Sequence, residues 1–236
     1  MSLAPAAPDT PVIATRRRST PAPRGVLPLG IFCILITALL AIIVQADAAQ
    51  PPFQELDEHW LGWMGGPHDG AYAAMAAVLD WFGGPLGVVV PVGLLIFLIM
   101  RKRRWSIFYL LVTYLGGGML VVQVIKYLVD RPRPENPMVR VDHGSFPSGH
   151  AAGAAMLVVM IGALMVPAVH RRAWWVGGVL FTMAMMWSRT WLHAHWLSDT
   201  VAGAAVGAGT ALLSWWVFRH KLALETTTGT PDVERA

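Results

Sequence analysis

Three short clusters in the second half of the chain carry side chains that could bind and transfer a phosphoryl group. In the first cluster, Lys126 is followed after six residues by Arg133 and Pro134. Lysine and arginine together can hold a tetrahedral anion, because the planar guanidinium offers paired donors beside the compact ammonium charge. Arg189, in the third cluster, adds another such cation. We therefore expect Lys126, Arg133 and Arg189 to bind phosphate oxygens.

The second cluster is the sequence Pro-Ser-Gly-His at residues 147–150, which opens an apolar run. A helix that begins here presents free backbone N–H groups and a partial positive charge to an anion. The Ser148 hydroxyl adds a donor, and Gly149 lets a ligand approach the backbone closely. Ser and Pro also occur at ordinary helix starts, so this tetrapeptide alone is weak support for a phosphate site.

The third cluster contains His195 and Asp199, which are four residues apart and so share a face if they lie on a helix. A carboxylate bound to one imidazole nitrogen fixes the tautomer and leaves the other nitrogen free to act as a nucleophile. Taken in isolation, the pair could equally be an interfacial histidine whose hydrogen bond only stabilises the fold.

A metal site is a further alternative, because His193, His195 and Asp199 could ligate zinc, with His143 and His150 nearby in sequence. Two arguments disfavour it. Residues two apart on a helix point to different faces, and three neighbouring cations would repel a divalent ion. We expect neither a metal nor another cofactor.

The composition indicates which elements hold these clusters. Of the 236 residues, 55% are hydrophobic and 14% are charged, and the mean hydropathy is +0.52. A soluble domain carries about 25% charged residues, so lipid must replace water around much of the chain. Six runs without a charge are each near the roughly 20 residues that a helix needs to cross a bilayer. They are residues 25–46, 81–100, 105–125, 151–169, 173–188 and 200–218. We expect an all-α, polytopic membrane protein, a six-transmembrane-helix bundle.

The positions of the Lys and Arg residues predict how the bundle is oriented. With the N-terminus in the cytoplasm, 13 of the 18 Lys and Arg residues lie inside and ten of the 14 acidic residues lie outside. This arrangement follows the positive-inside rule and predicts a multi-pass protein of the cell membrane with both termini inside. The three clusters then share the extracytoplasmic face. Two other outer arginines, Arg131 and Arg140, are interpreted as stray loop residues. The net charge of +4 gives no reason to expect nucleic acid as a partner.

The remaining segments predict tails and a long outer loop around a six-span domain at residues 25–220. Residues 1–24 and 221–236 are expected to be disordered cytoplasmic tails. Residues 47–80 mix aromatic, acidic and glycine residues, which suits short interfacial helices in the first outer loop. The first run resembles a secretory signal with its cleavage site, but its length favours a retained anchor. The single cysteine, Cys33, is interpreted as an apolar packing residue.

Taken together, the clusters resemble the signature of the type 2 phosphatidic acid phosphatase family. Its pattern is Lys-x6-Arg-Pro, then Pro-Ser-Gly-His, then Ser-Arg-x5-His-x3-Asp. The segments 126–134, 147–150 and 188–199 match it at every motif position. The vanadium haloperoxidases share the motifs but are soluble, and the six apolar runs argue against that branch.

The resemblance implies a metal-independent lipid phosphatase with a phosphohistidine intermediate. His195 would attack phosphorus, Asp199 would orient His195, and His150 would protonate the leaving oxygen and then activate water. The phosphate oxygens would be held by Lys126, Arg133, Ser148, Gly149 and Arg189.

Under this interpretation the substrate is a membrane lipid phosphate whose tail stays in the bilayer. Polyprenyl diphosphate, phosphatidic acid and phosphatidylglycerol phosphate are all compatible with the sequence. One alternative is a lipid phosphotransferase that uses the same phosphohistidine. Another is a non-catalytic lipid-binding or transport protein, although transporters tend to place ionisable residues at the bilayer midplane, where these runs have none.

Overall fold

The computed structural model describes residues 23–227, in which the chain forms helices and no strand. The elements are α1 (Val26–Ala46), α2 (Gln54–Met64), α3 (Gly70–Gly83), α4 (Pro85–Met100), α5 (Arg104–Leu111), the π-helix η1 (Val112–Val121), α6 (Val122–Val129), α7 (Gly149–Leu164), the 3-10 turn η2 (Ala168–His170), α8 (Arg171–Trp191) and α9 (Leu197–Thr227). The all-α prediction is confirmed for this part of the chain. Residues 1–22 and 228–236, which include most of both predicted tails, lie outside the described residues, and α9 continues past the boundary predicted at residue 220.

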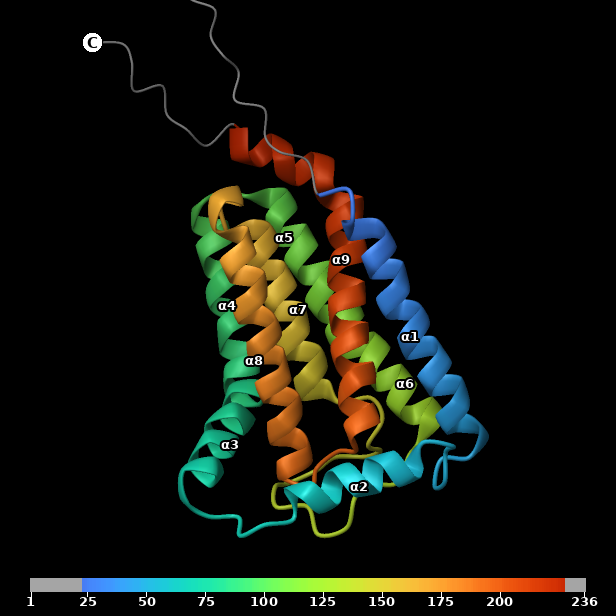
Figure 1. Cartoon of the computed structure of the whole chain (residues 1–236). Helices are drawn as coiled ribbons and strands as arrows, with labels where there is room; N and C mark the ends of the chain where they lie inside the picture. Colours follow the sequence, from blue (N-terminus) through green and yellow to red (C-terminus); the bar gives the residue numbers. More distant parts are fainter. Residues whose placement is uncertain (1–22, 228–236) are drawn as a thin grey trace, which may run out of the picture.

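The helices form an elongated bundle in which α9 lies between α1 and α7 (Figure 1). Large apolar side chains cover the outside of the bundle; Phe32 and Leu35 on α1 are 59% and 61% exposed, and Leu120 on η1 is 63% exposed. So many exposed apolar side chains are expected where the surrounding solvent is lipid.

Three helical segments are long and apolar enough to span a membrane: Val26–Ala46, Arg104–Val129 and Leu197–Glu225. The pair α3 and α4 becomes a fourth if its 47° bend at Gly83–Gly84 lies within one span. Helix α7 has 16 residues, about 24 Å at 1.5 Å per residue, and α8 is less apolar because it contains four tryptophans and three arginines. The membrane character is confirmed, while the count of six spans stays a prediction.

Close packing of α9 on α7 fixes the end of the bundle that carries the three clusters. A Cβ atom added at Gly203 would lie 2.3 Å from the backbone oxygen of Ser148, and one at Gly207 would lie 2.0 Å from that of Ala152. Only glycine permits such an approach of two helix backbones. The backbone N–H of Ser148 also donates to the carbonyl of Asp199 at 3.0 Å. The start of α7 and the start of α9 are therefore held against each other.

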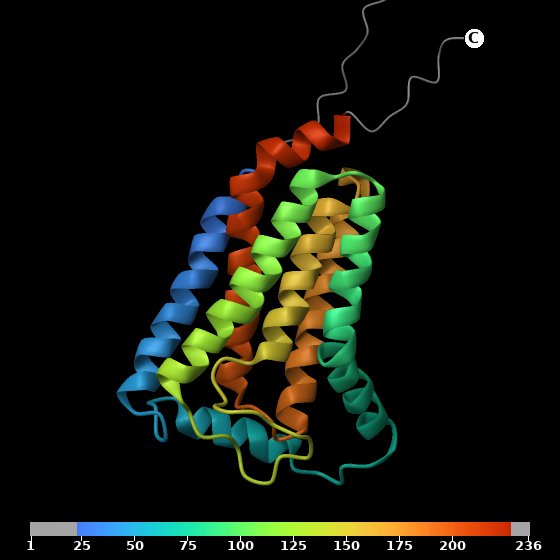
Figure 2. The same cartoon turned by 180° about the vertical axis from the view of Figure 1, so that it is seen from behind.

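The same end of the bundle is covered by α2 and by the loop between α6 and α7 (Figure 2). Helix α2 lies across the bundle axis and belongs to the predicted outer segment 47–80 (Figure 1). Asp57 and Gln54 on α2 are buried, whereas Trp63 is 77% exposed. The structure thus places a helix across this end of the bundle, and its position at a membrane interface stays a prediction.

Candidate active site

The predicted site residues come from four helix ends that meet beneath α2. Lys126 lies in the last turn of α6, and Arg189 lies in the last turn of α8. Ser148 precedes α7, and Gly149 and His150 are its first residues. Asp199 lies in the first turn of α9. Arg133 and His195 lie on the loops that follow α6 and α8. Residues spread over a third of the sequence are thereby brought to one end of the bundle.

His195 is buried and its ring is held in one orientation. Its Nδ1 lies 2.7 Å from the carbonyl oxygen of Ser145, to which it donates. Its distance to Asp199 Oδ2 is 3.7 Å, which is too long for a hydrogen bond. The protonated nitrogen is therefore Nδ1, and Nε2 carries the free lone pair, 3.4 Å from Nη1 of Arg133.

The surroundings of His195 favour the neutral imidazole. Burial, together with the nearby charges of Arg189 and Lys126, lowers the pKa of His195 to about 3, although Asp199 acts in the opposite direction. A buried cationic imidazole is costly because it loses its hydration. At neutral pH the ring is uncharged, with an unprotonated nitrogen facing the cationic side chains.

Asp199 is fully buried and is held by groups other than the imidazole. Its Oδ1 accepts from Arg131 at 2.7 Å, and its Oδ2 accepts from the backbone N–H of Trp196 at 2.9 Å. In this geometry the Ser145 carbonyl sets the tautomer of His195, while Asp199 fixes the turn on which His195 lies. A backbone carbonyl has no signature in the sequence, so sequence reasoning did not find Ser145.

Arg131 is the main residue that sequence analysis missed, because it was interpreted as a stray loop arginine. Its side chain is 0% exposed and pairs with Asp57 at 2.8 Å and with Asp199 at 2.7 Å. It also donates to Gln54 at 2.7 Å and to Ser198 at 2.8 Å. The rings of Phe53 and Trp196 lie 5.8 and 5.4 Å from its Cζ, within cation–π range. We call Arg131, Asp57 and Asp199 the sealed cluster.

Lys126 and Arg133 are joined by a carboxylate that the sequence analysis also did not single out. Oδ1 of Asp142 lies 3.4 Å from Nζ of Lys126 and 2.5 Å from Nη2 of Arg133. The two cationic side chains are 4% and 11% exposed, whereas the Asp142 side chain is 60% exposed. Burial raises the pKa of the Asp142 carboxyl, but Lys126 and Arg133 outweigh this effect and hold it below its ordinary value. We call these three residues the open cluster.

Arg189 and His150 meet at a third carboxylate, Asp80 of α3. Nη1 of Arg189 donates to Oδ1 of Asp80, and Nε2 of His150 lies 3.5 Å from the same oxygen. The His150 ring packs on Gly83, where an added Cβ would lie 2.2 Å from the ring. The end of α3 therefore sets the position of His150, and Asp80 brings the predicted outer segment into the site.

The start of α7 offers hydrogen-bond donors that an anion could accept from. The Ser148 hydroxyl is buried and has no hydrogen-bond partner among the described residues. An added Cβ at Gly149 would meet nothing within 4 Å. Buried polar groups are normally paired, so an orphaned hydroxyl beside free helix N–H groups fits a site that an anion completes.

A cavity of about 130 Å³ adjoins this helix start. It lies where α3 bends into α4, and it is lined by Gly83, Gly84, Tyr114, Gly118, Met119 and Gly149 among others. Most of its lining is apolar or glycine. The bend of α3–α4 and the glycines of η1 therefore leave open space that extends to Gly149.

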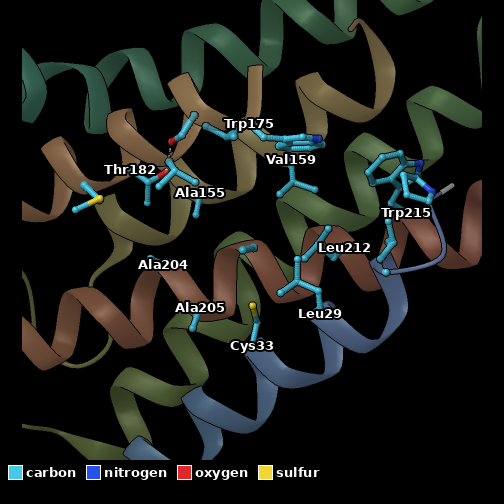
Figure 3. A pocket seen from close by; sticks show the side chains of 18 of the residues that line it. Leu29, Cys33, Ala155, Val159, Trp175, Thr182, Ala204, Ala205, Leu212 and Trp215 are labelled. Atoms are coloured by element: carbon cyan, nitrogen blue, oxygen red, sulfur yellow. Dashed lines mark hydrogen bonds between the residues drawn. The ribbon is translucent and has the colours of Figure 1, made fainter. Parts of the chain in front are cut away.

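An apolar groove of about 590 Å³ elsewhere in the bundle is separate from the site. Its walls come from α1, α7, α8 and α9, including Leu29, Ala155, Thr182 and Leu212 (Figure 3). None of the predicted catalytic or phosphate-binding residues lines this groove. The groove therefore lies apart from the candidate site.

His193, the histidine considered with His195 as a zinc ligand, is turned toward a different neighbour. Its ring packs edge-on against His68, with 5.3 Å between the ring centroids. Among the described residues, no group of three His, Cys, Asp or Glu side chains is arranged to hold a metal ion. The expectation that the site needs no metal stays a prediction.

Comparisons with known proteins agree with the sequence motifs. Residues 106–222 match the family model of the PAP2 superfamily. A solved structure of a transmembrane PAP2 type phosphatidylglycerolphosphate phosphatase from Bacillus subtilis has the same fold, with a TM-score of 0.62 and 24% sequence identity. The match covers 78% of this chain and 93% of that chain.

Curated relatives match over a similar region. Phosphatidylglycerophosphatase B of Bacillus subtilis is 26% identical over 52% of this chain and 61% of its own length. Undecaprenyl-diphosphatase of Sulfolobus acidocaldarius is 28% identical over 54% of this chain and 62% of its own length. Decaprenylphosphoryl-5-phosphoribose phosphatase of Mycobacterium tuberculosis is 30% identical over 46% of this chain and 58% of its own length. The chain spans about three fifths of the length of the curated relatives it matches.

Proposed function

Because residues 106–222 of this chain belong to the PAP2 superfamily, we propose that it is a membrane phosphatase that hydrolyses a phosphate monoester or diphosphate of a lipid. The observation that carries the proposal is the protonation and position of the His195 ring. Its Nε2 is unprotonated, and it lies 3.4 Å from Arg133 at the end of the bundle where Lys126, Arg189 and the start of α7 meet. A neutral nucleophile surrounded by cations is what attack on a phosphoryl group requires.

The first step transfers the phosphoryl group to the protein. Nε2 of His195 attacks phosphorus, the bond from phosphorus to the leaving oxygen breaks, and that oxygen takes a proton from His150. Charge that spreads over the phosphoryl oxygens is stabilised by Lys126, Arg133 and Arg189, by the Ser148 hydroxyl and by the N–H groups that begin α7. The proton on Nδ1 stays bonded to the Ser145 carbonyl as the imidazole gains positive charge.

The second step returns the protein to its starting state. Water attacks the phosphorus of the phosphohistidine, His150 takes a proton from that water, and the bond between phosphorus and Nε2 breaks. Inorganic phosphate is released. The residues of this chain supply the nucleophile, the acid–base group and the neutralising charge, so the proposed reaction needs no metal.

A lipid is the proposed substrate class because the site lies at the end of a helix bundle with an apolar outer surface. The cavity beside Gly149 is lined mostly by apolar residues and glycine, and we propose that a lipid brings its phosphate to the site beside this cavity while its tail stays in the bilayer. The relatives are named for phosphatidylglycerophosphate, undecaprenyl diphosphate and decaprenylphosphoryl-5-phosphoribose. Phosphatidic acid is a further candidate. We also propose, from the distribution of Lys and Arg, that the site faces the extracytoplasmic side.

The test is phosphate release by the purified chain in detergent, with several lipid phosphates and diphosphates and with EDTA present. We expect turnover of at least one lipid without added acceptor. We expect His195→Ala to reduce the rate by at least about a thousandfold while the protein still inserts and folds. His193→Asn is the matched control, because His193 lies two residues away and faces His68, and it should retain activity.

Each alternative has a distinct outcome in this assay. A phosphotransferase would release phosphate only when a second lipid or a glycan is supplied as acceptor. A binding or transport protein would release none under either condition. Full loss of activity with EDTA, restored by a divalent ion, would contradict the metal-independent mechanism and leave the phosphatase assignment intact.

A further inference from the structure

In the open cluster, a carboxylate already occupies the place where Lys126 and Arg133 are proposed to bind phosphate oxygens. We call this place the phosphate seat. A single oxygen of Asp142 contacts both Lys126 and Arg133, and Nε of Arg133 also donates to the backbone carbonyl of Asp142 at 3.1 Å. A phosphate oxygen held by this lysine and this arginine would need the same donors. The carboxylate therefore stands where part of the substrate anion would bind.

The exposure of the three side chains indicates which of them can leave. The Lys126 side chain is 4% exposed and that of Arg133 is 11% exposed, and a charge this far removed from water is costly without a partner. The Asp142 side chain is 60% exposed, so it can rotate into water with little loss of hydration. Lys126 keeps a second partner, the carbonyl of Gly144 at 3.0 Å, when the carboxylate moves away. The Asp142 carboxylate can therefore be exchanged for a phosphoryl group without leaving Lys126 buried and unpartnered.

Resting on the proposed function, we infer that Asp142 is an internal competitor for the phosphate seat. In the empty protein its carboxylate neutralises Lys126 and Arg133. When a phosphoryl group binds, the carboxylate moves into solvent and the phosphoryl oxygens take over its contacts. When inorganic phosphate leaves, the Asp142 carboxylate returns and re-forms its contacts with Lys126 and Arg133.

This exchange has two consequences for turnover. Binding of any phosphate is weakened by the free energy needed to break the contacts of Asp142. Release of inorganic phosphate is favoured by the same amount, because the cations regain a partner as the product departs. Removing the carboxylate should therefore tighten phosphate binding and increase product inhibition at the same time.

The experiment measures oxyanion binding to the full-length purified protein with the charge of Asp142 removed. We expect Asp142→Asn to bind inorganic phosphate about tenfold more tightly, measured as the phosphate-dependent rise in melting temperature, since a charge-assisted contact is worth roughly 1.5 kcal/mol. Inhibition by orthovanadate, a second tetrahedral oxyanion, should tighten by a similar factor. Without phosphate, the variant should melt at a lower temperature than the wild type.

A nearby acid provides the matched control. Asp130 lies at the start of the same loop with its side chain 63% exposed, and it pairs with His143 at 3.1 Å. It forms no ion pair with Lys126 or Arg133 among the described residues. Its left-handed backbone, with φ of 42°, suits asparagine. Asp130→Asn should bind phosphate within about twofold of the wild type, since it alters only a surface pair.

Two outcomes would overturn the inference. One is phosphate binding by Asp142→Asn that is equal to or weaker than that of the wild type. The other is tighter phosphate binding by Asp142→Asn but not by Asp142→Ser, because both variants remove the same charge. If Asp142→Asn fails to fold, the phosphate affinity of Asp142→Ser provides the test. Failure of the proposed function is distinguishable, because it would appear as a wild-type protein that binds phosphate but turns over no lipid phosphate.

Discussion

Arg131 and Arg133 are separated by one proline, yet they serve two different kinds of carboxylate cluster. Arg131 points into the sealed cluster, where Asp57 and Asp199 are 2% and 0% exposed. Arg133 points into the open cluster, where Asp142 is 60% exposed. Both clusters pair a buried guanidinium with carboxylates at hydrogen-bond distance. They differ in whether a carboxylate can reach water.

That difference separates structural charge from exchangeable charge. In the sealed cluster every partner has already lost its hydration, so removing one partner leaves an uncompensated buried ion. In the open cluster the carboxylate can regain its hydration outside, and a ligand can replace it. Two arginines only two residues apart therefore differ in role: Arg131 is structural, and Arg133 is proposed to bind a ligand.

The largest effect should follow from breaking the sealed cluster. Arg131→Leu leaves Asp57 and Asp199 buried without a cation, which costs about 3–5 kcal/mol. We expect low yield of folded protein and a large fall in the melting temperature in detergent. Arg140→Leu, an exposed arginine on the same loop, should melt like the wild type. Equal melting temperatures for the two variants would show that the sealed cluster is not structural.

Breaking the open cluster should affect catalysis more than stability. Arg133→Ala removes a donor to the phosphoryl oxygens, and loss of one such donor reduces kcat by about 10²–10³-fold. Its carboxylate partner can turn to water, so the free energy of unfolding should change by no more than about 1 kcal/mol. Phosphate release and thermal melting on the same preparation test both statements, with Arg140→Ala as the control. A loss of stability comparable to that of Arg131→Leu would contradict the distinction between the clusters.

The smallest effect concerns the pH dependence of stability at His195, which lies between the two clusters. The folded protein holds the pKa of His195 at about 3, and the unfolded chain has a value of about 6.5. Below pH 6.5 the unfolded chain therefore binds more protons, and stability falls as the pH decreases. Between pH 7 and pH 5 this costs the wild type about 2 kcal/mol.

His195→Gln cannot take up that proton, so its stability relative to the wild type should rise by the same amount over this pH range. Melting temperatures at several pH values between 7 and 5 provide the measurement. His220→Gln, at the far end of α9 and exposed, should follow the wild-type curve. A constant difference between His195→Gln and the wild type would mean that the buried imidazole does not resist protonation.

The cationic and histidine residues that the sequence predicted lie together in the candidate site, because their motif depends on residue type and spacing. Sequence reasoning missed Ser145, whose contribution is a backbone carbonyl, and Asp142, a loop carboxylate in no periodic pattern. Arg131 could have been found. An outer arginine opposes the positive-inside bias, and Asp57 on a predicted amphipathic segment was available as its partner.

For the fold, the sequence predicted the helices but not how they bend or which helices pack together. Apolar runs indicate where helices lie, but hydropathy does not report a bend, so the hydropathy of residues 81–100 did not indicate the 47° break between α3 and α4. The sequence Gly83-Gly84-Pro85 at the break is a helix-breaking signal that hydropathy does not register. The small residues at positions 202–209 of α9 are typical of close helix packing. Their partner, the backbone at the start of α7, is a tertiary contact that a single sequence does not specify.

The sealed cluster also constrains the order in which the protein assembles. Asp57 contacts Arg131 across 74 residues of sequence and Ser198 across 141. These contacts have a high sequence separation, so they form late compared with contacts within a helix. As the chain is synthesised from its N-terminus, α2 has no complete partner until the start of α9 has emerged. This end of the bundle, which carries the candidate site, is therefore the last part to close, and a truncated chain that lacks α9 has no assembled site.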